Sequence, residues 1–177
     1  IVIDDGSTDS SKDLLEKNKH LYDKLIINEI NKGKGFSVKK GILSATGSHI
    51  IFQDADFEYD PSEFKKFIKI FLDFDADGII GSRFVYSNYT RVHNILNKIG
   101  NFILSFVFNL LYNTTFTDIY SCYFAYKKKL LNANELKTEG FEQHAEILCK
   151  VIRNGEKFYE VPISYNGRDY SEGKKIR

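Results

Sequence analysis

The sequence has few of the residues that mark several common protein classes. Cysteine occurs only at Cys122 and Cys149, which is too few for a disulfide framework and fits two buried thiols in a reducing compartment. Neither sign of charge is in excess, since 25 Lys and Arg stand against 24 Asp and Glu and the net charge is +1. This balance argues against a nucleic-acid partner, whose binding proteins usually carry a basic surplus. No apolar run reaches the roughly 18 residues of a membrane span.

Methionine and tryptophan are absent, and methionine is missing even from the first position. The opening residues Ile1–Ile3 are typical of the end of a buried strand. We therefore expect further chain before Ile1, so that this end carries no information on targeting. The sequence is 42% hydrophobic and 28% charged, which is typical of a folded domain with its own core.

Short apolar runs alternate with helical patterns along the chain. Strands are expected at residues 1–3, 25–27, 49–53, 78–81, 122–126 and 158–163, and helices at 7–18, 34–45, 61–74, 91–112 and 141–153. The apolar strands do not alternate with polar positions, which is typical of a sheet that helices cover on both faces. The sequence therefore predicts an α/β domain with a mostly parallel central sheet.

The strongest chemical signal is the acidic segment DADFEYDP at 54–61, which follows the apolar residues IIF. Ligands of α/β sheets bind at the carboxyl ends of strands, where Asp54 and Asp56 are expected. Their carboxylates suit an oxygen-ligand site for Mg²⁺ or Mn²⁺ that leaves positions open for phosphate oxygens, with Glu58 as a third ligand. Asp60 precedes a proline and is expected to cap the next helix.

Three further segments follow strand ends or open helices. DDGSTD at 4–9 forms a glycine turn in which Asp4 is placed to accept a hydrogen bond from a nucleotide base. Asp5, Ser7 and Asp9 equally well only shape the turn and cap the helix. NKGKG at 31–35 opens a helix and permits close approach of an anion, although a flexible basic turn fits equally well. Arg83, in GSRF at 81–84, follows another strand and suits a phosphate.

Taken in order, these segments resemble the family 2 inverting glycosyltransferases, and among them the dolichyl- or polyprenyl-phosphate sugar transferases. The resemblance rests on IVIDDGSTD, NKGKGFSVKKGILSATG, IIFQDADFEYDP and GSRF, followed by EGFEQHAEI, EVPISYNGR and EGKKI. It implies a glycosyltransferase-A fold over residues 1–177, as a single catalytic domain that lacks its first strand and helix. It also implies a nucleotide-diphosphate sugar as donor, a lipid phosphate as acceptor and Mg²⁺ or Mn²⁺ as cofactor.

The resemblance also implies roles for individual residues. Asp56 binds the metal together with Glu58, although relatives often carry glutamine at the latter position. The residues expected at the nucleotide sugar are Asp4, Asp5, Lys34, Asp54, Arg83, Arg168 and Lys174. Those expected to be catalytic are Asp54, Asp56, Arg83 and Asp118. Two interpretations of Asp118 stay open, a general base and a residue that holds an arginine.

The acceptor and the reaction have alternatives. A transferase that acts on a glycan hydroxyl requires a general base, whereas a lipid phosphate arrives already ionised. The QXXRW motif of processive polysaccharide synthases is absent. A haloacid-type phosphatase also places DXD after a strand, but Glu58 stands where its motif has threonine or valine. A nucleotide-sugar-binding protein without catalysis is the non-enzymatic alternative.

The helix expected at 91–112 bears on the acceptor. It carries a broad apolar surface made by Phe102, Ile103, Leu104, Phe106, Val107, Phe108, Leu110 and Leu111. Such a surface fits either a core face or a helix that lies in a membrane interface, with Arg91 and Lys98 near one end. Under the second interpretation we expect a peripheral protein at the cytoplasmic face of a membrane.

Overall fold

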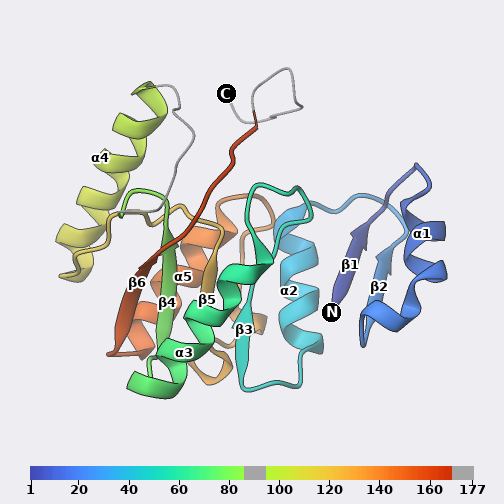
Figure 1. Cartoon of the computed structure of the whole chain (residues 1–177), viewed down its shortest axis with the longest axis horizontal. Helices are drawn as coiled ribbons and strands as arrows, with labels where there is room; N and C mark the ends of the chain where they lie inside the picture. The colour runs from blue at the N-terminus through green and yellow to red at the C-terminus, as the bar shows by residue number, and fades with distance from the viewer. Residues whose placement is uncertain (86–94, 169–177) are drawn as a thin grey trace.

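The computed structural model of this protein describes residues 1–85 and 95–168 (Figure 1). The strands are β1 (Val2–Asp5), β2 (Leu25–Asn28), β3 (His49–Ile51), β4 (Gly78–Ser82), β5 (Phe124–Lys127) and β6 (Phe158–Pro162). The α-helices are α1 (Ser11–Lys17), α2 (Lys34–Ser44), α3 (Phe64–Phe74), α4 (Ile95–Tyr112) and α5 (Gln143–Asn154). Each predicted element is present with shifted ends, and Arg91, at the expected start of the long helix, lies outside the described residues.

Local hydrogen bonds explain the shifted helix starts. The first helix begins at Ser11 rather than near Ser7, because Ser7 folds back on Asp4 and donates to both of its carboxylate oxygens. A 3₁₀ turn precedes α3, and Asp60 caps this turn by accepting from the Ser62 amide at 2.8 Å. The predicted capping role of Asp60 is therefore confirmed.

The main sheet has four strands in the order β3-β5-β4-β6. Strands β4 and β6 are parallel, whereas β5 runs antiparallel to both of its neighbours. The α/β class is confirmed, with one correction to the mostly parallel sheet, because β5 runs against the other three strands. The connection after β4 returns to the edge from which it left, so the next strand has to run the opposite way. As a result, β3, β4 and β6 end at one edge of the sheet and β5 begins there.

Helices cover both faces of this sheet, and each face has its own apolar core (Figure 1). On one face, α3 contributes Phe67 to a core that includes Ile79. On the other face, α5 contributes Leu148 to a core that includes Ile80 and Phe124. Successive strand residues point to opposite faces, so the neighbours Ile79 and Ile80 are both fully buried in different cores. This double burial explains why the strands lack polar alternation.

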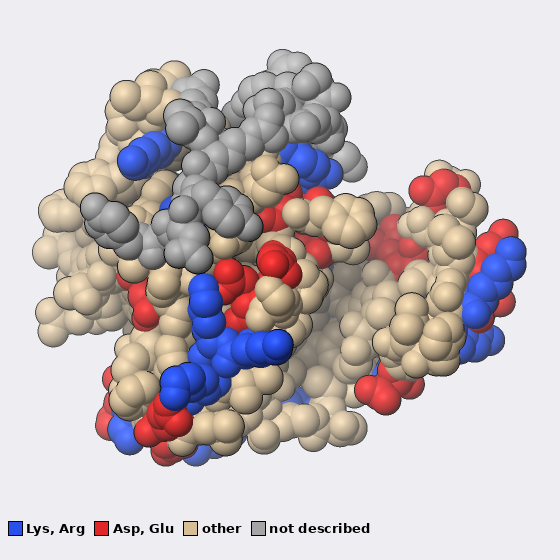
Figure 2. All heavy atoms as spheres, in the orientation of Figure 1, with Lys and Arg blue, Asp and Glu red and all other residues tan. Residues whose placement is uncertain are grey.

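Strands β1 and β2 form a separate parallel pair, aligned from Val2 opposite Leu25 to Asp5 opposite Asn28. In Figure 1, α2 lies between this pair and β3. Among the described strands, none pairs with the second edge of β1 or of β3. The surface is hollowed between the two parts of the molecule (Figure 2).

Helix α4 differs from the other helices because most of its apolar side chains face solvent. Only Ser105 and Phe108 are buried, whereas Phe102 is 68% exposed and Leu110 is 76% exposed. By length and composition alone the helix could cross a membrane, and 11% of it is buried inside the protein. In the described part of the chain, this broad apolar surface is therefore not a core face.

Candidate active site

The polar residues singled out in the sequence gather at the edge where β3, β4 and β6 end. Figure 2 shows acidic side chains near the centre of this face, at the level of the loop that joins β3 to α3. Asp54 and Asp56 lie in that loop, Arg83 directly follows β4, and Arg168 follows β6. Asp118 lies in the segment that leads into β5. The fold therefore brings residues from distant parts of the sequence to the edge where α/β sheets bind ligands.

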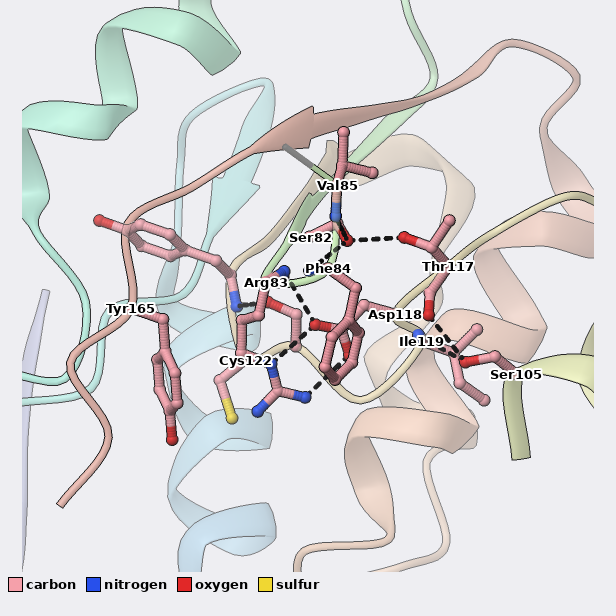
Figure 3. A network of polar contacts seen from close by, with 12 residues as sticks. Ser82, Arg83, Phe84, Val85, Ser105, Thr117, Asp118, Ile119, Cys122 and Tyr165 are labelled. Atoms are coloured by element: carbon pink, nitrogen blue, oxygen red, sulfur yellow. Dashed lines mark hydrogen bonds and ion pairs between the residues drawn. The ribbon is translucent and has the colours of Figure 1, made fainter. Parts of the chain in front are cut away.

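The most extensive contact in this site joins Arg83 to Asp118 (Figure 3). Arg83 donates from Nε to Asp118 Oδ2 at 2.7 Å and from Nη2 to Oδ1 at 2.8 Å, and its backbone amide adds a bond of 3.1 Å. The Asp118 side chain is fully buried, and that of Arg83 is 19% exposed. Burial opposes the charged guanidinium, but its bonds to Asp118 raise the pKa of Arg83. Both Asp118 oxygens thus hold the arginine, which favours the second of the two interpretations left open by the sequence, a residue that holds an arginine, over a general base.

The segment that carries Asp118 is itself braced by neighbouring strands. Glu160 of β6 accepts from the Thr117 amide at 2.8 Å and from the Asp118 amide at 3.1 Å. The Thr117 hydroxyl lies 2.6 Å from Ser82 Oγ, at the end of β4. These bonds fix the segment relative to both β4 and β6, and therefore fix the arginine that it holds.

Helix α4 is joined to the same segment. Ser105 donates to the Thr117 carbonyl and accepts from the Ile119 amide, both at 3.4 Å. Nearer the start of the helix, Lys98 Nζ lies 6.0 Å from the ring centroid of Phe84. The exposed apolar helix is therefore attached directly to the loop that positions the site arginine.

Lys34 connects the NKGKG turn to the acidic loop. Its Nζ lies 2.7 Å from Asp54 Oδ2 and 3.6 Å from Cys122 Sγ. Burial opposes the charged ammonium, but the neighbouring Cys122 and Asp54 together raise the pKa of Lys34. The Gly35 amide donates to the Glu139 carbonyl at 2.8 Å and so fixes the start of α2. The sequence-predicted residues Lys34 and Asp54 thus meet as an ion pair.

Arg168 makes the corresponding ion pair with Asp56. Its Nη2 lies 2.8 Å from Asp56 Oδ2, and its Nε lies 3.2 Å from Glu58 Oε1. Glu58 also accepts from the Arg168 amide at 3.0 Å and from the Tyr165 hydroxyl at 3.1 Å. Burial alone would raise the pKa of the Glu58 carboxyl, but these hydrogen bonds lower it. The expected third metal ligand therefore uses both of its oxygens to hold the chain that follows β6.

The carboxylates were expected to bind Mg²⁺ or Mn²⁺, and all three already hold a cation of the protein, Lys34 on Asp54 and Arg168 on both Asp56 and Glu58. Within residues 1–85 and 95–168, no three His, Cys, Asp or Glu side chains form a metal-binding group. The Asp56 side chain is 26% exposed and already holds a cation, the Arg168 guanidinium. One or two carboxylates together with phosphate oxygens and water are a usual site for Mg²⁺. Asp56 therefore fits a metal that a diphosphate also ligates.

Asp4 and Asp5 make their bonds within the N-terminal turns. Asp4 is buried, and both of its oxygens accept from Ser7. Asp5 accepts from the Gly33 amide and from Asn28 Nδ2, each at 2.8 Å. Burial alone would raise the pKa of the Asp5 carboxyl, but such hydrogen bonds lower it. Asp5 thus has the turn-shaping role that the sequence left open, and Asp4, which was expected to bind the base, also makes its bonds within a turn.

Three contributors to this site were not predicted, namely Cys122, Tyr165 and Glu160. Burial raises the pKa of the Cys122 thiol, which lies beside the lysine of the acidic loop. The Arg83 guanidinium lies 5.2 Å from the ring centroid of Tyr165. A charged residue inside the apolar strand FYEVP was the available signal for Glu160, whereas a cysteine or tyrosine looks like any core residue. Lys174 lies outside the described residues.

Comparison with known proteins decides the family. Residues 1–134 match the family described as Glycosyl transferase family 2. The chain belongs to this family. Its predicted enzyme class, a glycosyltransferase, and its predicted glycosyltransferase-A fold are confirmed.

Individual relatives agree with this membership. The family 2 chain is 30% identical over 176 residues to the uncharacterized protein MJ1222 of Methanocaldococcus jannaschii, covering 97% of this chain and 71% of that protein. It is 26% identical to Glycosyltransferase AglJ of Haloferax volcanii, covering 95% of this chain and 54% of that protein. Glucosyl-3-phosphoglycerate synthase from Mycobacterium tuberculosis shares the fold, with a TM-score of 0.69 at 16% identity, over 97% of this chain and 62% of the synthase. The chain thus spans 54% of AglJ and 62% of the synthase.

Proposed function

We propose that this family 2 domain is a metal-dependent inverting glycosyltransferase that moves a sugar from a nucleotide-diphosphate sugar to a polyprenyl phosphate, such as dolichyl or undecaprenyl phosphate. The exposed apolar surface of α4, which Ser105 attaches to the loop around Arg83, carries the proposal for the acceptor. A lipid-linked phosphate has to reach a cationic site while its chain stays in an apolar phase, and this arrangement offers both.

The cations at the ends of the strands support a diphosphate donor. The Arg83 side chain, at the end of β4, is 19% exposed, and Asp118 fixes its orientation. An arginine held in this way presents a planar group that pairs well with phosphate oxygens. Solved structures of the M. tuberculosis synthase hold UDP together with Mn²⁺ or Mg²⁺. By analogy we place the donor diphosphate of this chain between Arg83 and Asp56.

We further propose that Asp56 holds Mg²⁺ or Mn²⁺ beside that diphosphate. When bound, such an ion neutralises the charge that develops on the leaving group. Lys34 balances the charge of Asp54, so the acidic loop does not accumulate two unpaired carboxylates around the donor. Glu58 does not take part in this metal site, because its oxygens accept hydrogen bonds from Arg168 and Tyr165.

The residues of this chain position the reactants and balance their charge. Arg83 and Arg168 present guanidinium groups to the diphosphate, whose negative charge grows as its bond to the sugar breaks. The acceptor phosphate attacks the opposite face of the sugar, so the anomeric centre inverts. Because a phosphate monoester is already an anion, no proton has to be removed, and Asp118 stays bound to Arg83 throughout. An acceptor that needs no general base is compatible with this site, because the Asp118 carboxylate is bound to Arg83.

We also propose that the protein acts as a peripheral protein at the cytoplasmic face of a membrane. The supporting observation is the exposure of α4, whose apolar side chains include Phe102, Phe106 and Leu110. With the helix in the interface, the loop that Ser105 holds would lie close to lipid head groups.

The test uses the chain with liposomes that contain undecaprenyl phosphate or, as the control, undecaprenol without the phosphate. Radiolabelled UDP- and GDP-sugars are supplied in turn with Mn²⁺, and label in the lipid extract is counted. We expect one donor to label the phosphate-containing liposomes only, and the label to disappear with Asp56→Asn. Label that instead enters a soluble glycan in the presence of the same donor would contradict the lipid acceptor.

A further inference from the structure

The residues after β6 form a strap, defined here as Ser164–Arg168, that lies along the loop carrying Asp56. Tyr165 forms an antiparallel bridge with Tyr59, and the Asn166 amide donates to the Glu58 carbonyl at 3.0 Å. The Tyr165 hydroxyl and the Arg168 amide add bonds of 3.1 Å and 3.0 Å to the Glu58 carboxylate. Main-chain bonds on both sides therefore anchor the strap independently of the Arg168 side chain.

The Arg168 guanidinium itself bridges two acidic side chains at the surface of the site. It lies 2.8 Å from Asp56 Oδ2 and 3.2 Å from Glu58 Oε1. The Arg168 side chain is 39% exposed and that of Asp56 is 26% exposed. Solvent and ions can therefore reach the contact, and the guanidinium can leave Asp56 without opening the core or releasing the strap.

We propose that Arg168 occupies the position on Asp56 that a divalent metal requires, so that the metal and the Arg168 side chain exclude one another there. This inference rests on the proposed function in one respect, namely that the metal binds at Asp56. Arg168 takes Asp56 Oδ2 and the Glu58 amide donates to Oδ1 at 3.3 Å, so an arriving ion meets two oxygens that already accept hydrogen bonds. Two cations on one carboxylate also repel each other. Arg168 therefore lowers the affinity of the empty site for metal.

The arrival of a donor changes this balance. A nucleoside diphosphate brings several anionic oxygens, which offer Arg168 a new partner and the metal additional ligands. Arg168 then leaves Asp56 for the diphosphate, while Tyr165 and Asn166 keep the strap in place. This exchange makes metal and donor bind cooperatively, because the donor draws Arg168 away from Asp56 and so favours binding of the metal. By linkage, the bound metal favours binding of the donor by the same factor. Arg168 thus keeps the metal off Asp56 until the donor is present and then pairs with the donor.

The test measures Mn²⁺ affinity by electron paramagnetic resonance, without reference to transfer activity. Without nucleotide, we expect Arg168→Gln to bind Mn²⁺ about 5- to 10-fold more tightly than wild type, which is the order of a typical coupling between two sites. With UDP or GDP present, the gain should vanish, so that the ratio of affinities with and without nucleotide is smaller in the variant. Arg168→Lys keeps the charge but loses the two-pronged contact. Its Mn²⁺ affinity without nucleotide should therefore lie between those of wild type and Arg168→Gln.

Lys69→Gln is the matched control, since it removes the same charge from an exposed pair with Asp73 on α3 and should leave Mn²⁺ affinity unchanged. Equal Mn²⁺ affinity of wild type and Arg168→Gln, with binding abolished by Asp56→Asn, would overturn this inference and leave the proposed function intact. An Arg168→Lys variant that matches wild type would also overturn it, because a distant charge effect would then suffice. Failure of every variant to bind Mn²⁺, even with nucleotide, would overturn both.

Discussion

Three cations of the site form ion pairs with acidic side chains, as Lys34 with Asp54, Arg83 with Asp118 and Arg168 with Asp56. The three pairs differ in burial, and this decides which can exchange partners. Asp118 is fully buried, so its separation from Arg83 would leave a charge unpaired inside the protein. The other two acids keep about a quarter of their side chains exposed, at 26% each. The Arg83 pair is therefore permanent, and the pairs of the acidic loop are exchangeable.

Asp118→Asn should destabilise the fold and lower activity without removing a titrating base. We expect the free energy of unfolding to fall by about 3 kcal/mol, because one charge of a buried pair is left uncompensated. Asp73→Asn, in an exposed pair on α3, is the control and should change it by less than about 0.5 kcal/mol. Urea unfolding and the dependence of kcat on pH are the measurements. Unchanged stability together with the loss of one limb of the pH profile would restore the general-base interpretation.

At this scale the sequence predicted which residues meet but not what each would do. The acids after β3 and the arginine after β4 could be placed, because strand ends converge at one edge of the sheet. The role of Glu58 could not be placed, because its partners Tyr165 and Arg168 are more than a hundred residues away in the chain. The role of Asp118 was open because the sequence does not show that its side chain meets Arg83, and only its burial against Arg83 distinguishes a positioning residue from a base.

Among the elements, α4 and the strand pair β4–β6 show two different uses of apolar and polar residues. Helix α4 exposes its apolar side chains and attaches to the protein through Ser105 and Phe108. At the other end of the sheet, the Asp77 carboxylate joins the starts of β4 and β6 by accepting from the amides of Glu156 and Lys157. The exposed apolar side chains of α4 predict an interaction with a partner outside the molecule. The bonds of Asp77 predict a local contribution to the stability of the fold.

Replacing two exposed phenylalanines of α4 should abolish membrane binding. Phe102→Asp with Phe106→Asp alters side chains that are 68% and 60% exposed and leaves the buried Phe108 untouched. We expect liposome flotation to fall at least about tenfold, because each inserted phenylalanine contributes about 1.5 to 3 kcal/mol. Leu72→Asp, on α3 at 79% exposure, is the control and should float like wild type. Equal flotation of the folded double variant would show that α4 does not contact lipid.

The contribution of Asp77 to stability should depend on pH. Although burial opposes it, hydrogen bonds from Glu156, Lys157 and Lys127 lower the pKa of Asp77 to about 2 in the folded chain, from 3.8. The stabilisation is therefore complete above pH 3.8 and is lost as the pH falls from there toward 2. Asp77→Asn should cost about 2 kcal/mol in urea unfolding at pH 7 and clearly less at pH 3. A cost that stays constant over this range would contradict the charge-dependent role.

The molecule as a whole consists of a four-stranded sheet with helices on both faces and a separate β1–β2 pair beside it. The fold class was predictable because buried strands lack alternation, and that pattern survives shifts of several residues at the ends. The direction of β5 was not, because it depends on where the chain returns after α4 rather than on the composition of the strand. The separation of the β1–β2 pair from the main sheet was also not predictable from local sequence patterns, because it depends on which strands form hydrogen-bonded pairs.

Extension of the chain upstream tests whether a further strand pairs with β1 or β3. We propose that about 30 further residues, enough for a strand and its crossover, supply a partner for the edge of β1 or β3 with which no described strand pairs. We expect nucleoside diphosphates to bind more tightly and light scattering to report a single species. A short chain as monodisperse and as tight in nucleotide binding as the long one would contradict this expectation.

The central claim is that Asp56 holds a divalent metal that is shared with the diphosphate of a nucleotide sugar. Isothermal titration calorimetry of UDP and GDP, with and without Mn²⁺, tests it most directly on wild type and on Asp56→Asn. We predict that Mn²⁺ raises the affinity of wild type for one of them by at least about tenfold. The same ion should raise the affinity of Asp56→Asn less than about twofold, because a hard cation loses its charged ligand. An equal effect of Mn²⁺ on both proteins, with the fold of the variant intact, would contradict the account.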